Sequence, residues 1–458
     1  MTSARVGASF RDPDGVFYLL DGAPRRQLHA SYASDWALLH SSGLLDALWR
    51  ADLLIPHREV SLYDRLDERA VAVIAPDQIP FISYPYEWSQ SQLLAAAQLT
   101  LQVQLLALQH GMALKDASAF NVQFIGAGAL FIDTLSFAAY VPGTPWAAYR
   151  QFCQHFLGPL ALMRHTDVRL RDLSRTHIDG PPLDLVSRLL PRSTWLQPSL
   201  LAHIHLHARG IAQHAESPRP AAAGRGVTRD GLQALLEHLQ SSVAALTWQG
   251  RRTEWGGYGA SDGYSAAAQQ AKEAFVRTTA TQHRPRTAFD LGANTGRYSE
   301  LVADSGAQVT AIDGDAGAIE ALLTRLQAAG RTDILPLWVD LTNPSPSQGW
   351  AHDERMSLEA RGPADLVLAL ALVHHLAIGN NLPLDAILAF LMRLGHRVVI
   401  EWVPKSDPQA QRLLVSREDI FTDYTEARFV AACEQHGRIE AREALPESAR
   451  ILFTVVPR

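Results

Sequence analysis

The 458-residue sequence predicts an α+β domain followed by an α/β domain, in which helices cover both faces of a parallel sheet. The length supports two or three domains, because a domain takes about 150 residues. Residues 209–230 are rich in Pro, Gly and Ala and lack apolar periodicity, which is typical of a linker. From residue 287 onward, short β-rich runs alternate with helical stretches. We therefore expect domains at 1–208 and 231–458, joined by the linker.

The second half contains the alternating elements that a doubly wound sheet requires. Leucines at helical spacing over 231–246 predict a helix before the sheet. Further helices are predicted over 297–306 and 316–330, and the second of these ends on Gly330. The predicted strands are apolar almost throughout, as expected when both faces of a parallel sheet are buried. In chain order these strands cover 287–292, 307–313, 333–340, 365–371 and 397–403.

The first half has a different pattern, which favours an α+β domain. Residues 17–22 and 71–76 have the composition of strands. One long apolar stretch, 91–111, predicts a helix that ends at Gly111. The segment "NVQFIGAGALFID" (121–133) predicts two short strands around a Gly-Ala-Gly turn.

Composition and charge exclude several classes of protein. A net charge of −6 without a dense Lys/Arg block argues against a nucleic-acid partner held by its phosphates. The cysteines, Cys153 and Cys433, are too few for a disulfide framework. The first 15 residues lack the apolar core of a signal peptide, and the most apolar run, 366–378, is too short to span a bilayer. We expect a cytoplasmic protein that is not embedded in a membrane.

The stretch "DLGANTGRYS" (290–299) follows a predicted strand and opens a predicted helix, which is the setting of a nucleotide-binding loop. Gly292 and Gly296 allow a tight turn and a close approach of the backbone to a ligand. Asn294 stands where the dinucleotide fingerprint has glycine, which disfavours NAD. Asp313 ends the next strand, where a carboxylate can accept hydrogen bonds from ribose hydroxyls.

These motifs resemble the class I S-adenosylmethionine (SAM) dependent methyltransferases over roughly residues 250–458. The resemblance implies a Rossmann-like fold and SAM as the cofactor. It further implies that Asp313 holds the ribose, that Asp340 lies near the adenine, and that the methionine and ribose part is surrounded by Asp290, Gly292, Asn294 and Gly296. Taken alone, Gly296 could serve only helix packing, and Asp340 could serve only as a turn cap.

Two histidines after the fourth strand are the first candidates for a catalytic base. His374 and His375 follow a predicted strand at the sheet edge where ligands bind in open α/β folds. An ordinary imidazole titrates near neutrality and can take a proton from a hydroxyl. The alternative is a pair of histidines at a helix start, one packed and one solvated. Glu401, at the end of the fifth strand, is a second candidate.

The acceptor of the methyl group is expected to be a small molecule. The Asn/Asp-Pro-Pro-aromatic signature of many amino-group methyltransferases is absent, and the corresponding run is "LALALVHH" (368–375). This disfavours methylation of adenine in nucleic acid and leaves carbon, oxygen or another acceptor atom open. Upstream, Trp255, Tyr258 and Tyr264 lie among glycines, where the resemblance implies an aromatic segment that closes over SAM. Ordinary aromatic packing is the alternative.

The segment "LKDASAFN" (114–121) and the later Asp133 resemble the core of protein-kinase-like phosphotransferases, over about residues 15–165. The resemblance implies that Asp116 accepts the substrate proton and that Asn121 and Asp133 hold Mg²⁺. The sequence departs from this family in its motifs and in its phosphate-binding elements. Leu114 replaces a histidine, and "DTL" replaces Asp-Phe-Gly. Residues 1–80 contain no glycine-rich loop, and no lysine precedes Lys115. Arg25 or Arg26 is the available substitute for the phosphate-binding lysine.

We therefore expect a degenerate kinase-like domain that binds or positions a substrate or partner. The alternatives are an active phosphotransferase, a coincidental spacing of common residues, and a non-catalytic scaffold with a vestigial SAM pocket. The run "HIHLHARG" (203–210) would place His203, His205 and His207 on one face of a strand, suited to a metal, but would spread them around a helix. Because no carboxylate or cysteine lies near them in the sequence, no metal site is expected.

Overall fold

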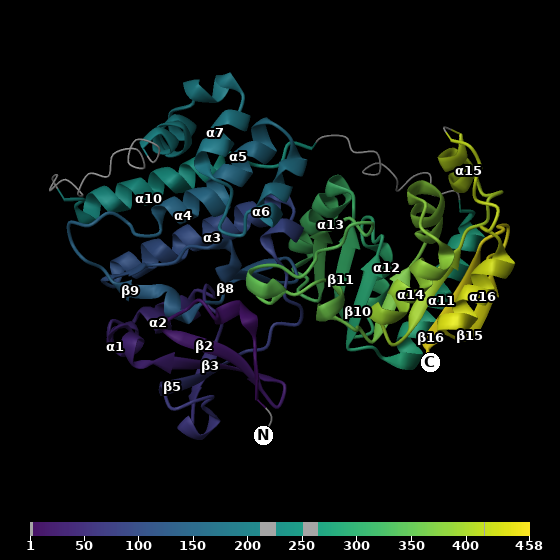
Figure 1. Cartoon of the computed structure of the whole chain (residues 1–458), viewed down its shortest axis with the longest axis horizontal. Coiled ribbons are helices and arrows are strands. Elements are labelled where there is room, and N and C mark those ends of the chain that lie inside the picture. The colour runs from purple at the N-terminus through teal and green to yellow at the C-terminus, as the bar shows by residue number, and fades with distance from the viewer. Residues whose placement is uncertain (1–2, 211–225, 251–263, 416) are drawn as a thin grey trace. The chain divides into compact units, whose positions relative to one another are not determined.

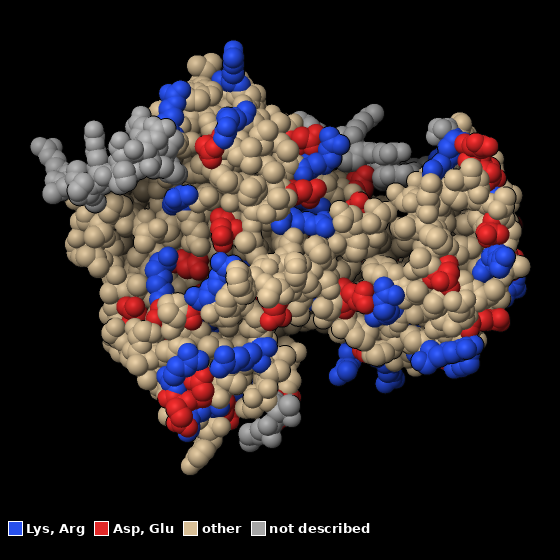
Figure 2. Space-filling view, in the orientation of Figure 1, with Lys and Arg blue, Asp and Glu red and all other residues tan. Residues whose placement is uncertain are grey.

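The computed structural model describes residues 3–210, 226–250, 264–415 and 417–458 (Figure 1). The chain forms two compact units. The first contains Met1–Phe124, Ala129–Gln249 and Gln348–Arg355, and the second contains Ile125–Gly128, Gly250–Ser347 and Met356–Arg458. Figure 2 shows acidic and basic side chains interspersed on the visible face of each unit.

The first unit begins with a five-stranded antiparallel sheet in the order β1-β2-β3-β5-β4. The predicted strands at 17–22 and 71–76 are confirmed as β2 and β5, and two helices, α1 (Ala33–Ser41) and α2 (Leu44–Arg50), follow β3. Leu28, Ala72 and Ile74 of this sheet form one buried hydrophobic cluster with Tyr32 and Leu135. The strands are β1 (Ser3–Arg5), β2 (Gly15–Leu20), β3 (Ala23–His29), β4 (His57–Val60) and β5 (Ala70–Pro76).

A long buried helix, α3 (Gln90–Gln109), follows the sheet and confirms the helix predicted at 91–111. Ser89 caps it by accepting a hydrogen bond from the Gln92 backbone N–H, and the Gln92 side chain accepts one in return from the Ser89 N–H. Within the described part of the chain, α3 is the helix that is long and apolar enough to cross a membrane. The core helix of a folded domain can be equally long and apolar, and 61% of the apolar stretch of α3 is buried inside the protein.

Short strands and helices follow α3, and the turn Ile125–Gly128 between two of these strands is counted with the second unit. β6 (Met112–Leu114) pairs with β9 (Phe137–Ala139), and β7 (Val122–Ile125) pairs with β8 (Gly128–Phe131), as predicted for the Gly-Ala-Gly turn. The helices that follow are α4 (Tyr149–Phe152), α5 (Gly158–His165), α6 (Leu173–Thr176), α7 (Leu183–Leu189) and α8 (Pro198–Leu200).

The predicted start of the second domain at residue 231 is wrong, because α10 (Arg229–Ala244) belongs to the first unit. Its leucines pack inward, with Leu232, Leu236 and Leu239 buried. The Gln90 Nε2 donates to the Leu246 carbonyl at 2.9 Å, which ties the chain after α10 to α3. The boundary therefore lies near residue 250. Most of the predicted linker, 211–225, lies outside the described residues.

A second segment also departs from the predicted boundaries. Residues 348–355 follow the third strand of the second unit in sequence but fold with the first unit. Glu354, which is 5% exposed, accepts hydrogen bonds from Arg11 Nη2 at 2.6 Å and Nε at 3.0 Å. The Arg355 guanidinium lies 4.1 Å from the centre of the Phe120 ring. Local sequence patterns do not indicate these contacts, because the partners lie far apart along the chain.

The second unit is built on a seven-stranded sheet in the order β12-β11-β10-β13-β14-β16-β15. The first five strands are parallel, in the order that doubly wound dinucleotide-binding sheets also use, and β16 runs antiparallel to both neighbours. The five predicted strands are confirmed, whereas β15 and β16 were not predicted. The strands are β10 (Thr287–Leu291), β11 (Gln308–Asp313), β12 (Ile334–Trp338), β13 (Leu366–Ala369), β14 (Val398–Trp402), β15 (Gly437–Ala444) and β16 (Ile451–Pro457).

Helices accompany this sheet as the βα alternation requires (Figure 1). α12 (Arg297–Ala303) follows β10, α13 (Ala316–Ala329) follows β11, and α14 (Leu384–Leu394) follows β13. The other helices are α11 (Ala266–His283), α15 (Pro408–Leu414) and α16 (Glu426–His436). The strand order reverses between β10 and β13, and ligands of open α/β sheets bind at the carboxyl ends of the strands at such a point.

Candidate functional site

The glycine loop after β10 adopts the backbone conformation that its residues predict. Gly292 and Gly296 have φ angles of 78° and 83°, in the left-handed region that favours glycine. A Cβ on Gly296 would also lie 2.5 Å from Leu322 Cδ1 of α13, so this glycine serves helix packing as well. Asn294 has a φ of 49°, which asparagine tolerates better than most residues.

Asp313 lies against this loop. Its Oδ2 accepts a hydrogen bond from the Asn294 backbone N–H at 2.8 Å, and its Oδ1 accepts one from the Asp315 N–H at 2.8 Å. Burial raises the pKa of Asp313, while the N–H groups of Asp315 and Asn294 pull the pKa back. Each carboxylate oxygen can accept a second hydrogen bond, so Asp313 keeps acceptor capacity for a ligand hydroxyl.

Asp290 and Asp340 occupy different surroundings from Asp313. Asp290 is 2% exposed inside β10 and accepts a hydrogen bond from Ser299 Oγ at 2.6 Å, which ties the strand to α12. Burial raises the pKa of Asp290 to about 6. Asp340 is exposed after β12, where its Oδ1 accepts from the backbone N–H and hydroxyl of Thr342 at 2.8 and 2.7 Å. These hydrogen bonds are those of a turn cap, the alternative role named for Asp340, and its place near an adenine stays a prediction.

The turn after β13 carries the two candidate histidines next to the glycine loop. A Cβ on Gly292 would lie 3.5 Å from Leu372 Cδ1, so this turn packs against the loop. His374 is 1% exposed, and neither of its ring nitrogens has a hydrogen-bond partner in the described structure. Its ring centre lies 4.1 Å from that of His375, which is partly buried. The alternative of a packed and a solvated histidine at a helix start therefore stays open, because His374 is packed and His375 keeps partial exposure.

The expected titration of His374 near neutrality is also contradicted. Burial lowers the pKa of His374 to about 2, and His375, Arg450 and Lys272 contribute to this decrease. Burial and Arg450 likewise lower the pKa of His375. Both imidazoles are therefore neutral at physiological pH. His374 can still accept a hydrogen bond, but its imidazole is not protonated near neutral pH as that of an ordinary histidine base is.

Glu401 is anchored in an ion network at the end of β14. It is fully buried, with Lys272 Nζ 2.7 Å from its Oε2 and the Tyr264 hydroxyl 2.6 Å from its Oε1. The Ala371 backbone N–H donates to Oε2 at 2.9 Å, and Arg450 Nη1 lies 3.5 Å from Oε1. Burial raises the pKa of Glu401, but Lys272 and Arg450 outweigh this effect and hold its pKa below the usual value. Glu401 is thus an ionised structural partner.

Sequence reasoning missed Lys272 and Arg450. Both are 2% exposed, and Arg450 also binds Asp407 through Nε at 2.7 Å and Nη2 at 3.0 Å. Tyr264 has Lys272 Nζ 4.5 Å and Arg450 Cζ 4.3 Å from its ring centre, so this member of the predicted aromatic segment belongs to the network. The other two members, Trp255 and Tyr258, lie outside the described residues.

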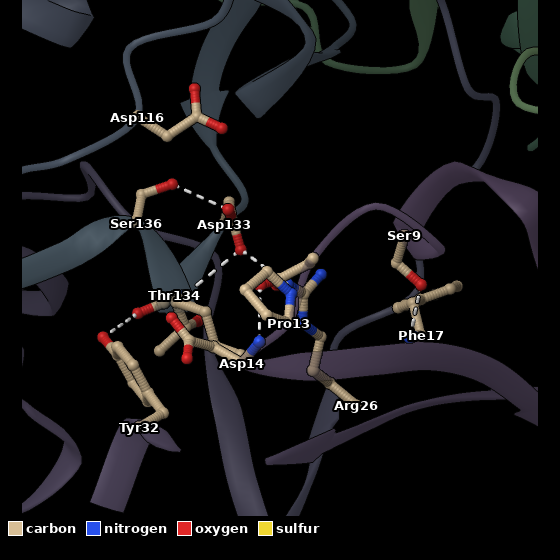
Figure 3. Close-up of polar contacts among 12 residues, drawn as sticks. Ser9, Pro13, Asp14, Phe17, Arg26, Tyr32, Asp116, Asp133, Thr134 and Ser136 are labelled. Atoms are coloured by element: carbon tan, nitrogen blue, oxygen red, sulfur yellow. Dashed lines mark hydrogen bonds and ion pairs between the residues drawn. The ribbon is translucent and has the colours of Figure 1, made fainter. Parts of the chain in front are cut away.

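In the first unit, the residues predicted for phosphotransfer lie around Ser136 (Figure 3). The Ser136 hydroxyl donates to Asp133 Oδ2 at 2.7 Å, and Asn121 Nδ2 donates to Ser136 Oγ at 3.1 Å. Asn121 Nδ2 also lies 3.5 Å from the Asp116 carbonyl oxygen. Burial raises the pKa of Asp116, and the nearby Asp133 raises it further. The structure therefore brings Asp116, Asn121 and Asp133 together.

The cations next to these residues are paired with carboxylates of the chain itself. Arg26 of β3 lies 3.2 Å from Asp133 Oδ1 and also forms an ion pair with Asp12 (Figure 3). Lys115 forms an ion pair with Asp14, and its Nζ lies 4.8 Å from the centre of the Tyr32 ring. The sequence "RDPDG" (11–15) indicates only a turn, so the roles of Asp12 and Asp14 were missed.

The histidines of "HIHLHARG" lie in a π-helical turn, Leu201–Leu206, and the following helix, so the strand interpretation is wrong. His203 pairs with the Tyr149 hydroxyl at 2.7 Å and with His238 at 2.8 Å. His205 pairs with Ser187 Oγ at 2.8 Å and with Thr194 Oγ1 at 2.9 Å. In the described ranges, no group of three or more His, Cys, Asp or Glu side chains is arranged to hold a metal ion.

Solved structures similar to parts of the chain include methyltransferases. Monomeric WbdD is 19% identical over 44% of this chain and 43% of its own, with a TM-score of 0.30, and another WbdD structure is described as a bifunctional kinase-methyltransferase. The N-methyltransferase NodS from Bradyrhizobium japonicum WM9 is 10% identical, with coverages of 42% and 98% and a TM-score of 0.31. The chain spans less than half of WbdD.

A search against protein-family models finds no match. Among curated proteins, the nodulation protein NoeA of Rhizobium meliloti strain 1021 is 35% identical over 463 residues. The match covers 98% of this chain and 95% of NoeA, so it includes both units. The chain therefore belongs to the family of the nodulation protein NoeA.

Proposed function

We propose that the second unit is a SAM-dependent methyltransferase that acts on a small-molecule acceptor. The observation that carries this proposal is the contact between the glycine loop and Asp313, in which the Asn294 N–H donates to Asp313 Oδ2 at 2.8 Å. Both parts follow neighbouring parallel strands, beside the point where the strand order of the sheet reverses. A loop with positive φ angles next to a strand-end carboxylate suits a nucleoside ligand.

The residues present fit SAM. Asp313 has acceptor capacity for the ribose hydroxyls, and Gly292 and Asn294 line the loop where a methionine part would lie. Asp290 accepts a hydrogen bond from Ser299 and so joins β10, which precedes the loop, to α12, which follows it. Gly296 has no side chain, which allows Leu322 of α13 to pack against the loop. Asp340 is exposed beyond β12, where the resemblance to methyltransferases implies the adenine. When bound, SAM supplies an activated methyl group.

The remaining task of the chain is to hold the acceptor in line and to exclude water. The turn of Leu372–His375 lies against the glycine loop and supplies buried side chains for this purpose. Glu401 holds the turn through the Ala371 N–H. We therefore assign His374 and His375 to acceptor binding and Glu401 to support of the turn, in place of catalysis by an ionising base.

Isothermal calorimetry with SAM tests the proposal on the full chain. We expect saturable binding with one site per chain and a dissociation constant well below 1 mM, of order 10 µM for a working enzyme. The absence of binding at about 1 mM SAM would contradict the methyltransferase proposal. Binding without methyl transfer to any component of a cell extract would favour the alternative of a scaffold with a vestigial SAM pocket.

We propose that the first unit is a degenerate kinase-like domain that binds a substrate or partner. The resemblance implies an antiparallel sheet, then a long helix, then the catalytic loop, and β1–β5, α3 and Asp116 occur in that order. Arg26 takes the place of the phosphate-binding lysine but is held by Asp12 and Asp133. Lys115 is held by Asp14. These carboxylates disfavour nucleotide phosphates in the same place.

Nucleotide binding distinguishes this proposal from an active phosphotransferase. Calorimetry with ATP and Mg²⁺ should show no stoichiometric binding to the full chain. Binding that requires Mg²⁺ and is lost in Asp133→Ala would instead support the phosphotransferase alternative.

The family relationship and the surface guide the choice of partners. We extend to this chain the role in nodulation that the name of its relative states. The net charge of −6 and the interspersed surface charges of Figure 2 support a small molecule over a nucleic acid. We propose that the protein acts in the cytoplasm, and disruption of its gene followed by a nodulation assay and cell fractionation tests both points.

A further inference from the structure

We infer that the methyl acceptor is a hydroxyl compound, an alcohol or a phenol, whose O–H group binds to His374. This inference rests on the proposed methyltransferase function and names the acceptor class of that site. Three observations support it: the unpartnered ring of His374, the cations near that ring, and the fixed geometry of the turn that carries it.

The His374 ring is a buried polar group without a partner in the described structure. It is 1% exposed, and both Nδ1 and Nε2 lack hydrogen bonds. Burying such a group without a partner is unfavourable, so most buried polar side chains are hydrogen-bonded. His374 lies in the turn that packs on Gly292 through Leu372. An acceptor bound beside the glycine loop would satisfy the ring.

The surroundings of His374 select the charge of that acceptor. Lys272 and Arg450 both act on the ring as positive charges, because both lower the pKa of His374. An ammonium group next to the ring would meet the same repulsion, which disfavours an amine in its protonated form. A neutral imidazole offers one N–H donor and one nitrogen acceptor, and a hydroxyl can both donate and accept. The site therefore suits a neutral hydroxyl better than an amine.

The turn that presents His374 is held in one conformation. Ala371 has a φ of 50°, in the left-handed region that is strained for a residue other than glycine. The hydrogen bond from its N–H to Glu401 Oε2 stabilises this conformation, and Lys272 and Tyr264 fix Glu401 in turn. His374 is therefore presented by a rigid support, as substrate orientation requires.

The transfer balances without any further reactant. The acceptor oxygen forms a bond to the methyl carbon, the carbon–sulfur bond breaks, and its electron pair stays on sulfur. The hydroxyl proton is lost to water once the oxygen carries the methyl group, and His374 holds the hydroxyl through a hydrogen bond only. No ionising base is required, because an oxygen that has gained a methyl group while keeping its proton is a strong acid that gives this proton to water.

Carbon-labelled SAM tests the acceptor class while the compound itself is still unidentified. The full-length protein is incubated with ¹³C-methyl SAM and a small-molecule extract of source cells that lack the gene. The carbon chemical shift of each new methyl signal distinguishes O-methyl from N-methyl, S-methyl and C-methyl products. Calorimetry measures the SAM affinity of every variant beforehand, so failure of cofactor binding is distinguished from failure of acceptor recognition.

We expect an O-methyl product whose formation falls at least tenfold in His374→Phe, with SAM affinity unchanged. His374→Gln should recover part of the activity, because the amide can donate and accept a hydrogen bond. His396→Phe is the matched control, since His396 is exposed before the amino end of β14. An N-methyl, S-methyl or C-methyl product, or an O-methyl product that His374→Phe leaves unchanged, would overturn the inference. If calorimetry detects no SAM binding by the unaltered protein, the proposed function is overturned instead.

Discussion

Glu401 accepts a hydrogen bond from the Ala371 backbone N–H at 2.9 Å, and this contact joins the end of β14 to the left-handed turn after β13. The same carboxylate is bound by Lys272 of α11 and by the Tyr264 hydroxyl just before that helix. Three segments that are distant in sequence thus fix the position of one turn. The same turn carries His374 and packs on the glycine loop through Leu372, so the ion network supports the geometry of the proposed acceptor site.

Replacing Glu401 with glutamine should destabilise the second unit by about 3–5 kcal/mol. The substitution leaves Lys272 and Arg450 buried with one carboxylate fewer, and an uncompensated buried charge is costly. Urea unfolding monitored by fluorescence gives the change in the free energy of unfolding. The matched control is Glu426→Gln, because Glu426 forms an exposed pair with Arg442 worth at most about 1 kcal/mol. Equal effects of the two substitutions would contradict the structural role of Glu401.

Gly296→Ala should destabilise the second unit by more than about 1 kcal/mol and weaken SAM binding. The added Cβ would lie 2.5 Å from Leu322 Cδ1, and the φ of 83° strains any L-residue. Gly314→Ala is the control for stability, since a Cβ at that position has no neighbour within 4 Å. Thermal unfolding and SAM titration of both variants check the prediction. A Gly296→Ala protein with unchanged stability would show that the loop does not pack as described.

The buried neutral His374 should make stability depend on pH. Because its pKa is lowered by burial to about 2, the unfolded state binds more protons than the folded state between about pH 6.5 and that value. The stability that His374 contributes is therefore fully present above about pH 6.5 and is lost by about 1.4 kcal/mol for each pH unit below it. Urea unfolding at about pH 7 and about pH 5 should show a loss of stability that His374→Phe reduces, while the part from His375, whose pKa burial also lowers, remains.

The control for this pH effect is His396→Phe, which replaces an exposed histidine. That variant should lose stability on acidification as much as the unaltered protein does. If His374→Phe behaves in the same way, the ring of His374 is not held neutral by the folded structure.

Much of the second unit could be predicted, because its signals are local. Strands buried on both faces of a parallel sheet appear in the sequence as apolar runs. The glycines at 292 and 296 indicate a turn whose backbone needs positive φ angles. The pairing of Asn294 with Asp313 follows from the same pattern, since parallel strands bring their carboxyl ends together. In the first unit, the spacing of Asp116, Asn121 and Asp133 correctly indicated that they lie close together.

The parts that were missed depend on contacts between distant segments. Nothing near Lys272 or Arg450 in the sequence indicates that both reach Glu401. The depth at which His374 is buried is also a property of the assembled fold, so its titration was predicted from the ordinary value. The composition of 209–230 suggested a linker, but it does not indicate that α10, which follows it, packs on the first unit.

The SAM affinity of Asp313→Ala, compared with that of the unaltered protein, tests the central claim most directly. Calorimetry should show a loss of about 1–3 kcal/mol in binding free energy, because a hydrogen-bonding carboxylate is removed from the ribose position. Asp304→Ala, which replaces an exposed partner of Arg331, should bind SAM as the unaltered protein does. Unchanged affinity in Asp313→Ala would contradict the proposed site.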